Sequence, residues 1–254
     1  MTLHVHEWGQ PGLPVVVCLH GVLAHGRRFR RLAEERLGGL HVLAPDLRGH
    51  GGSTWEPPWT IERHVEDVLE LLGERGLERA PFIGHSFGGR LTLELTARGV
   101  VERSVLLDPA IWVPPPIALE RAEEMRADRS WASVDEAVDA RAPTARLAPR
   151  AALEEEMREH LVRSEDGRWR YRYSQAAVVA AYGELAQPPP EWEHVRVPTL
   201  LVVGAETDVV PEAMVEAVRD GLREYVQVLT VSGGHIPLWD AFDETASAVT
   251  RFLA

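Results

Sequence analysis

The sequence contains no lysine: its 27 basic residues of the Lys and Arg type are all arginines. A lysine Schiff base is therefore excluded, and with it pyridoxal-phosphate and lysine-aldolase chemistry. A Walker-type phosphate loop is excluded too, because it requires a Gly-Lys pair. Cys18 is the single cysteine, so neither an intramolecular disulfide nor a cysteine-rich zinc site can form. It lies in an apolar run and is expected to be a buried small hydrophobic residue.

Positive charge is scarce as well. The 27 basic residues face 39 acidic ones, which gives a formal net charge of -12 at pH 7. Proteins that bind nucleic acid or attach electrostatically to anionic membranes usually carry the opposite charge. No apolar run approaches the roughly 20 residues that cross a bilayer, and the first ten residues lack the pattern of a signal peptide. We expect a soluble, cytoplasmic protein without a nucleic-acid or membrane partner, and the oligomeric state stays undetermined.

Length and composition predict one large globular domain. The chain has 254 residues, 45% of them hydrophobic and 26% charged, values close to those of average soluble domains. Short apolar runs, typical of strands buried on both faces in a parallel sheet, alternate with amphipathic stretches. This alternation predicts an α/β fold. The candidate strands are residues 3–8, 14–19, 41–44, 80–84, 104–107, 199–203 and 227–231, and the best helical candidates are 28–37, 61–75, 88–98, 211–222 and 241–253.

The middle of the chain departs from this rhythm. Two proline runs, 114–116 and 188–190, enclose several helical stretches and one aromatic segment, 168–173. Because proline runs are stiff and extended, they make natural borders between structural units. We expect a helical cap over residues 113–190, inserted into a core domain formed by residues 1–112 and 191–254.

The most specific motif is Gly84-His85-Ser86-Phe87-Gly88. It follows a predicted strand and opens a predicted helix, which is the context of the G-x-S-x-G nucleophile elbow. The serine of such an elbow occupies a strained turn, and glycines beside it make room for that turn. We therefore predict that Ser86 is a catalytic nucleophile. The alternative is a serine that only caps the helix.

A second motif, His20-Gly21-Val22, follows the strand at 14–19. In this arrangement the loop donates one backbone N–H to an oxyanion, and the residue after the nucleophile donates another. These donors are predicted to be Val22, or its neighbour Leu23, and Phe87. His20 is expected to organise the loop, and an ordinary strand-to-helix turn is the alternative.

A histidine base and an acid are expected farther along the chain. His235 follows two glycines in a loop between the last strand and the last helix, where it is free to reach Ser86. Asp208 follows the strand at 199–203 and is assigned as the acid that orients His235. Asp108, at the end of the strand at 104–107, is the alternative acid, and Glu206 is a further rival.

Together these residues resemble the α/β-hydrolase superfamily over nearly the whole chain. The segment Asp46-Leu47-Arg48-Gly49-His50-Gly51 is similar to the family's D-x-R-G-x-G loop. The resemblance implies a mostly parallel eight-stranded sheet flanked by helices, with a helical cap inserted after the sixth strand. Only seven candidate strands are found. The serine nucleophile, the His-Gly-Val loop and Phe87 distinguish the chain from haloalkane dehalogenases and epoxide hydrolases, from the hormone-sensitive-lipase type and from proline iminopeptidases.

This reading predicts a serine hydrolase that cleaves a small or medium carboxylic ester or lactone through an acyl-enzyme on Ser86. The alternatives are a carbon–carbon bond hydrolase or an elimination or synthase-like enzyme that uses the same triad, and a small-molecule receptor without turnover. The substrate is expected to be a small molecule. No cofactor or metal is predicted: His4 and His6 share one face of a strand, but the sequence shows no third ligand beside them.

The cap is expected to cover the site and to contribute part of its pocket. The aromatic residues of this region also fit a small core of the cap itself. The candidate pocket residues are Leu23, His85, Trp112, Trp131, Tyr182 and Ile236.

Overall fold

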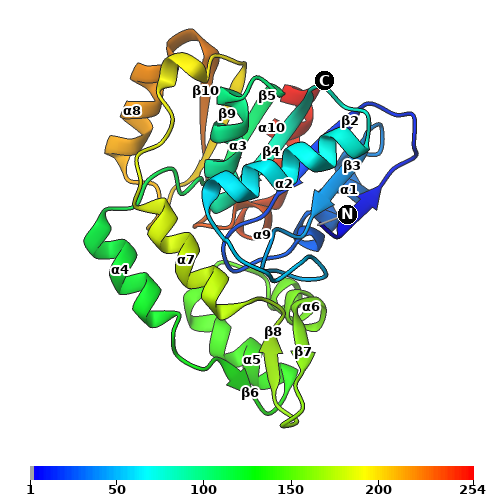
Figure 1. Cartoon of the computed structure of the whole chain (residues 1–254), viewed down its shortest axis with the longest axis vertical. Helices are drawn as coiled ribbons and strands as arrows, with labels where there is room; N and C mark the ends of the chain where they lie inside the picture. The colour runs from blue at the N-terminus through cyan, green and yellow to red at the C-terminus, as the bar shows by residue number, and fades with distance from the viewer. Residues whose placement is uncertain (1–2) are drawn as a thin grey trace.

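The computed structural model describes residues 3–254. Its centre is a seven-stranded sheet in the order β1-β3-β2-β4-β5-β9-β10, in which β1 is antiparallel to β3 and the other pairs are parallel. Every strand predicted from the sequence is present (Figure 1). The strands are β1 (Val5–Trp8), β2 (Val15–Leu19), β3 (His41–Pro45), β4 (Ala80–His85), β5 (Val101–Leu107), β9 (Thr199–Gly204) and β10 (Val226–Val231).

The expected eighth strand is absent from this sheet within residues 3–254, so the cap follows the fifth strand of the chain rather than the sixth. Of the described residues before β2, those of β1 alone form a strand of this sheet, and β1 pairs with β3 as an antiparallel edge strand. The α/β-hydrolase type of fold is nevertheless the one predicted.

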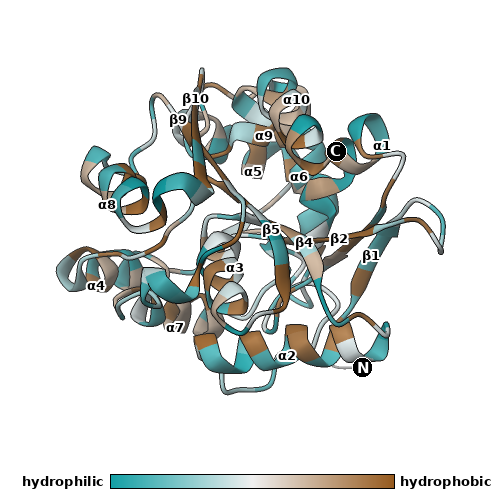
Figure 2. Cartoon of the chain, turned by 90° about the horizontal axis from the view of Figure 1, so that it is seen from above, coloured by the Kyte–Doolittle hydropathy of each residue, from teal (hydrophilic) through white to brown (hydrophobic). Residues whose placement is uncertain are grey.

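Helices cover both faces of the sheet, and the strands between them are rich in hydrophobic residues (Figure 2). One face carries α2 (Ile61–Glu74), α3 (Phe87–Ala97) and α8 (Glu212–Leu222), and the other carries α1 (Arg30–Arg36) and α10 (Phe242–Leu253). The turns η1 (Gly26–Phe29), η3 (Trp192–His194) and η4 (Arg223–Tyr225) and the short helix α9 (Pro237–Asp240) complete the core.

Helix α2 illustrates why these segments are helical. Its apolar residues recur every three or four positions, and Ile61, Val65 and Val68 are among those buried against the sheet. Thr60 caps the helix, because its side chain accepts a hydrogen bond from the Arg63 N–H at 3.2 Å. The helix predicted over this segment is confirmed.

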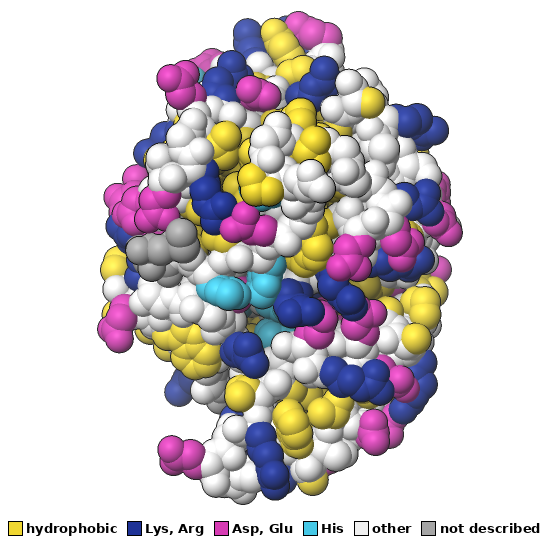
Figure 3. Space-filling model, turned by 90° about the vertical axis from the view of Figure 1, so that its right-hand side faces the viewer, with side chains coloured by type: hydrophobic (Ala, Val, Ile, Leu, Met, Phe, Trp, Pro, Cys, Tyr) yellow, Lys and Arg dark blue, Asp and Glu magenta, His cyan; other side chains and the backbone are white. Residues whose placement is uncertain are grey.

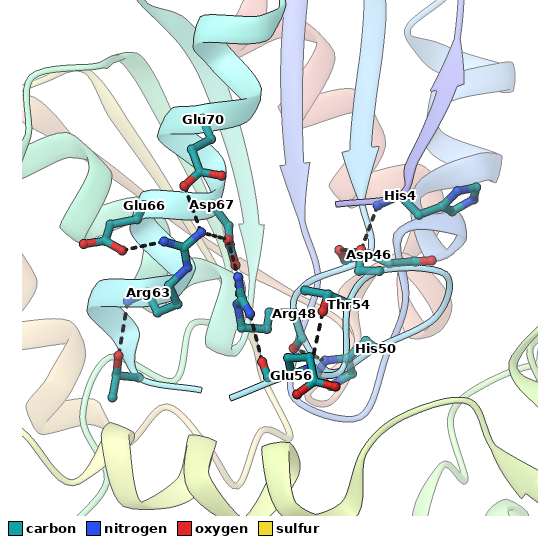
Figure 4. A network of polar contacts seen from close by, with 12 residues as sticks. His4, Asp46, Arg48, His50, Thr54, Glu56, Arg63, Glu66, Asp67 and Glu70 are labelled. Atoms are coloured by element: carbon teal, nitrogen blue, oxygen red, sulfur yellow. Dashed lines mark hydrogen bonds and ion pairs between the residues drawn. The ribbon is translucent and has the colours of Figure 1, made fainter. Parts of the chain in front are cut away.

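Below α2, a buried ion pair fixes the loop after β3 (Figure 4). The Arg48 guanidinium donates to both carboxylate oxygens of Asp67, at 2.7 and 2.8 Å, and to the Glu56 carbonyl at 2.8 Å. Such a two-point contact fixes direction as well as distance. The Asp46–Gly51 loop is thereby held to helix α2.

The insertion between β5 and β9 contains more than helices (Figure 1). It has four helices and a three-stranded antiparallel sheet in the order β6-β8-β7, so the cap holds more extended structure than the single aromatic stretch expected. Its own apolar cluster includes Val138, Leu153 and Met157. The elements are α4 (Pro115–Glu124), β6 (Ser130–Trp131), α5 (Val134–Arg141), η2 (Ala142–Thr144), α6 (Arg150–His160), β7 (Leu161–Arg163), β8 (Trp169–Tyr171) and α7 (Gln175–Leu185).

Arg90 of α3 joins both ends of this insertion to the core. Its side chain is almost fully buried and donates to the carbonyls of Ile111, Gln187 and Pro188 at 2.7–2.9 Å. Since the first carbonyl precedes the insertion and the other two end it, a single guanidinium fixes the position of both connections.

Two further observations concern single sequence predictions. Cys18 is fully buried in β2, as expected, and burial raises the pKa of its thiol. Among the described residues, no helix is long and apolar enough to cross a membrane.

Candidate active site

Ser86 stands at the sharp turn between β4 and α3, with backbone angles φ 53° and ψ -117°. A positive φ is unfavourable for a residue with a side chain. The turn persists because its backbone is well anchored: the Ser86 N–H donates to the Leu107 carbonyl at 3.2 Å, and the Ser86 carbonyl accepts from the Ala110 N–H at 3.1 Å.

The two glycines of the motif have a steric explanation. A Cβ on Gly88 would lie 2.0 Å from the Leu19 carbonyl oxygen, and one on Gly84 would lie 2.4 Å from the Gly88 carbonyl oxygen. Both distances are far below van der Waals contact, so only glycine allows β2, β4 and α3 to approach this closely. The predicted elbow is therefore present as a local structure.

His235 lies beside Ser86. Its Nε2 is 3.0 Å from the Ser86 Oγ, and its Nδ1 is 2.7 Å from an oxygen of Asp108. Because a carboxylate only accepts hydrogen bonds, Nδ1 carries the proton and Nε2 is free to accept one from the serine hydroxyl. The three side chains form a continuous series of hydrogen bonds.

The carboxylate in this series is that of Asp108, and not that of Asp208 as expected. Asp208 is exposed, four residues beyond β9, and it makes no hydrogen bond with His235. The sheet order explains the correction: β5, which is followed directly by Asp108, lies beside β4, whereas β9 is one strand farther away. Since adjacent strands are about 4.8 Å apart, a side chain at the end of β5 has much the shorter distance to cover.

The end of β9 and the segment after it still contribute to the site, but through other groups. The Gly204 N–H donates to one oxygen of Asp108 at 3.0 Å, and the Thr207 hydroxyl donates to the other at 2.6 Å. With the bond from His235, the fully buried carboxylate of Asp108 accepts three hydrogen bonds. These bonds compensate for the burial of its charge and fix its orientation.

The His20–Val22 loop lies directly against Ser86. A Cβ on Gly21 would be 3.0 Å from the Ser86 Cβ and 3.4 Å from its Oγ, so the loop passes within contact distance of the nucleophile. Phe87 begins α3, and the first N–H groups of a helix have no acceptor inside the helix. The position of both segments is compatible with the predicted N–H donors at Val22 and Phe87.

His20 organises this loop. The Leu47 N–H donates to His20 Nε2 at 2.8 Å, so Nε2 is an acceptor and Nδ1 carries the hydrogen that bonds to the Gly21 carbonyl at 2.8 Å. Burial, with a contribution from nearby His50, lowers the pKa of His20, which keeps the ring neutral. His50 Nε2 lies 2.7 Å from the Val22 carbonyl oxygen and holds the next residue of the loop.

The expected pocket residues fall into two groups. Leu23 and Tyr182 are partly buried against the cluster that contains Val22 and Phe87, so they remain candidates for lining the pocket. His85 is buried beside His235, with its Nε2 2.8 Å from the His235 carbonyl oxygen, where it supports the catalytic loop. Ile236, also a candidate, is buried directly after His235.

The contacts of Trp112 and Trp131, the other two candidates, lie within the cap and at its connections to the core. Trp131 packs on the apolar cluster of the cap, with its ring 5.1 Å from that of Tyr171, because β6 and β8 pair there. Trp112 is 40% exposed and its indole N–H donates to the Ala186 carbonyl at 3.2 Å. It bridges the two connections of the cap at the surface.

Thr207 and Gly204 were not predicted from the sequence. No local motif marks them, since their role depends on the neighbouring strand β5. The sequence did contain a signal for Asp108 as the acid, because this residue directly follows the apolar residues 105–107 of a strand. The carboxyl ends of adjacent parallel strands meet at one edge of a sheet, so side chains at these ends can come together in a site.

The chain is similar to known proteins in both sequence and fold. The model of the family described as "Alpha/beta hydrolase family" matches residues 16–248. The chain is 35% identical to the lipase LipV of Mycobacterium tuberculosis, over 93% of this chain and 92% of that protein. It is 25% identical to the esterase YbfF of Escherichia coli, over 94% and 92% of the two chains.

A solved structure with the same fold is that of E-2-(acetamidomethylene)succinate hydrolase. It superimposes with a TM-score of 0.86, covering 99% of this chain and 94% of that one, at 22% sequence identity. At this level of identity the likeness concerns the fold alone.

Proposed function

The chain belongs to the alpha/beta hydrolase family, and on this basis we propose that it is a serine hydrolase for a small or medium carboxylic ester or lactone. The observation that carries the proposal is the continuous contact from Ser86 through His235 to Asp108, at 3.0 and 2.7 Å. Both distances are within the range required for proton transfer and for holding the base.

In the proposed reaction, the Ser86 oxygen attacks the carbonyl carbon of the ester while His235 Nε2 takes the hydroxyl proton. Asp108 keeps the imidazole in the tautomer that accepts this proton and stabilises the resulting cation. The tetrahedral intermediate collapses as His235 returns the proton to the leaving alcohol. Water then attacks the acyl-enzyme with His235 as base, which releases the acid and restores the serine.

The negative charge on the carbonyl oxygen needs donors that are already in place. We assign the N–H groups of Val22 and Phe87 to this task, which is supported by the contact of Gly21 with Ser86 and by the start of α3 at Phe87. Loss of one such donor typically costs about 3–4 kcal/mol of transition-state stabilisation. The bonds from His20 and His50 to this loop preserve its shape before the substrate arrives.

Carboxylic esters are the preferred substrate class because the named relatives over most of the chain include a lipase and an esterase. The partly buried Leu23 and Tyr182, beside Val22 and Phe87, offer an apolar surface for an acyl group.

The test is the hydrolysis of p-nitrophenyl acetate, butyrate and octanoate by the wild type, by Ser86→Ala and by Ser247→Ala as a matched control. Ser247 lies on α10, outside the proposed site. We expect Ser86→Ala to lose at least about 10⁴-fold in kcat, and Ser247→Ala to match the wild type. Equal turnover in Ser86→Ala would refute the proposed nucleophile. Absence of turnover in the wild type, with cleavage of a carbon–carbon substrate, would refute the ester assignment.

A further inference from the structure

We infer that His4, His6 and Asp46 form a binding site for one divalent transition-metal ion of the zinc type. This site is separate from the proposed hydrolase function, because none of the three residues contacts Ser86, Asp108 or His235. Among the described residues, these three side chains bring possible ligand atoms within 4.8 Å of one another.

The fold supplies the third ligand that the sequence did not reveal. His4 and His6 project to the same side of the N-terminal edge segment because side chains alternate along an extended chain, and their rings are 4.7 Å apart. The antiparallel pairing of β1 with β3 sets Val5 opposite Pro45. Asp46, the next residue after β3, thereby reaches the two imidazoles.

The distances agree with metal coordination. His6 Nε2 lies 3.1 Å from an oxygen of Asp46. Zinc bonds to imidazole nitrogen and carboxylate oxygen are about 2.0–2.2 Å long, so this separation corresponds to an N–Zn–O angle of about 100°, within the range of a tetrahedral site. His4 is exposed, so in the proposed site its ring turns toward the other two ligands, and water is the fourth ligand.

The carboxylate is oriented before a metal binds. The Gly26 N–H donates to one oxygen of Asp46 at 2.8 Å, and the Gly52 N–H donates to the other at 2.9 Å. Such bonds to a ligand are the outer shell that fixes metal sites. Figure 4 shows Asp46 in the loop beneath His4, whose N–H bonds to Ser53 at 2.8 Å.

Access from solvent favours this place, and an ion pair argues against the other candidate cluster. Histidine side chains lie together at the centre of the face in Figure 3, and His4 borders a groove lined also by Gly52 and Ser53. A second group of possible ligands, His25, Glu156 and His160, is buried, and the Arg28 guanidinium is paired with its carboxylate. A cation already bound there disfavours a metal, so the exposed group is the one assigned.

The experiment is a calorimetric titration of the tag-free chain with ZnCl₂, together with thermal unfolding. His4→Ala and His6→Ala are the test variants. His194→Ala is the matched control because His194 is an exposed histidine of η3 outside the cluster, and His235→Ala tests for binding at the proposed active site. Asp46 is left unchanged, because its bonds to Gly26 and Gly52 support the fold.

We expect one zinc per chain and at least a tenfold loss of affinity in His4→Ala and in His6→Ala, with no change in His194→Ala or His235→Ala. At zinc about 100-fold above Kd, the Tm of the wild type should rise by about 5–10 °C, and MgCl₂ should have no effect because Mg²⁺ prefers oxygen ligands. Absence of zinc binding would overturn the inference, as would wild-type affinity in the two test variants. Neither result would affect the proposed hydrolase function.

Discussion

Replacement of Asp108 by asparagine tests the assignment of the acid most sharply. The carboxylate accepts from the Gly204 N–H on one oxygen, and from the Thr207 hydroxyl and His235 Nδ1 on the other. An amide of the same shape has one acceptor oxygen and one donor nitrogen. Its orientation therefore decides what His235 encounters.

The Gly204 N–H selects the orientation of that amide. The backbone N–H of Gly204 can only donate, whereas the Thr207 hydroxyl can turn to accept and His235 can change its tautomer. With the amide oxygen toward Gly204 all three groups can be satisfied, whereas the opposite orientation sets the Gly204 N–H against an amide N–H. The amide NH₂ group therefore faces His235, and Nδ1 can respond only by accepting its hydrogen. The ring then carries its own hydrogen on Nε2, pointing at Ser86, and cannot take the serine proton.

We expect Asp108→Asn to lower kcat by about 10⁴-fold, which is the loss that the same replacement causes in a Ser-His-Asp hydrolase. This loss corresponds to an increase of about 5 kcal/mol in the activation barrier. The assay is steady-state hydrolysis of p-nitrophenyl butyrate, with thermal unfolding to verify the fold. Asp208→Asn is the matched control. Because Asp208 is exposed and makes no hydrogen bond with His235, its variant should keep wild-type kcat. A large loss in Asp208→Asn, or a loss below about tenfold in Asp108→Asn, would contradict the reasoning.

Three further predictions concern stability and the cap. Gly88→Ala places a Cβ 2.0 Å from the Leu19 carbonyl oxygen, so it should abolish folding or lower the free energy of unfolding, measured by chemical denaturation, by more than about 3 kcal/mol. Gly183→Ala is the control, because it adds a Cβ in open space on α7, and it should be neutral or raise the free energy of unfolding by up to about 1 kcal/mol. Equal effects of the two variants would contradict the steric argument. Arg90→Met leaves the buried Ile111 carbonyl and the more exposed Gln187 and Pro188 carbonyls without their donor, so it should lower Tm and raise KM more than it lowers kcat. Unchanged values of all three would argue against a role in holding the cap. Burial lowers the pKa of His64 to about 3, below its value of about 6.5 in the unfolded chain. The stability that the neutral ring contributes is therefore fully present above about pH 6.5 and is lost toward pH 3, and the loss reaches about 2 kcal/mol at pH 5. Guanidinium unfolding at both ends of this pH range should show a smaller loss in His64→Gln than in the wild type, and an equal loss would exclude His64 as the cause.

The sequence predicted much of the fold because its signals there are local. All seven core strands were predicted, and several of them, such as β2 and β9, are continuous apolar runs, since a strand buried on both faces needs no polar residues. The structure of the cap was harder to predict from the sequence. Its short strands β6, β7 and β8 span only two or three residues each, too few for an alternating pattern, and the segment was expected to be helical apart from one extended stretch.

The site divides in the same way. Ser86 and His235 were identified because the elbow and the loop after the last strand are recognisable from a few neighbouring residues. The acid was not, because two aspartates followed two strands and nothing local separates them. The sequence likewise showed two ligands of the proposed metal site, His4 and His6. It did not reveal the third, because Asp46 lies 40 residues beyond His6 in the chain.

By itself the sequence determined the strands and main helices, the buried Cys18, the serine elbow and the histidine beside it, since each depends on the chemistry of adjacent residues. Only the tertiary structure decided which aspartate meets His235, which aromatic residues belong to the cap's core, and which carboxylate joins His4 and His6. The physical reason is the order of strands in the sheet. It sets β5 beside β4 and β1 beside β3, and no periodicity along the chain specifies which strands become neighbours.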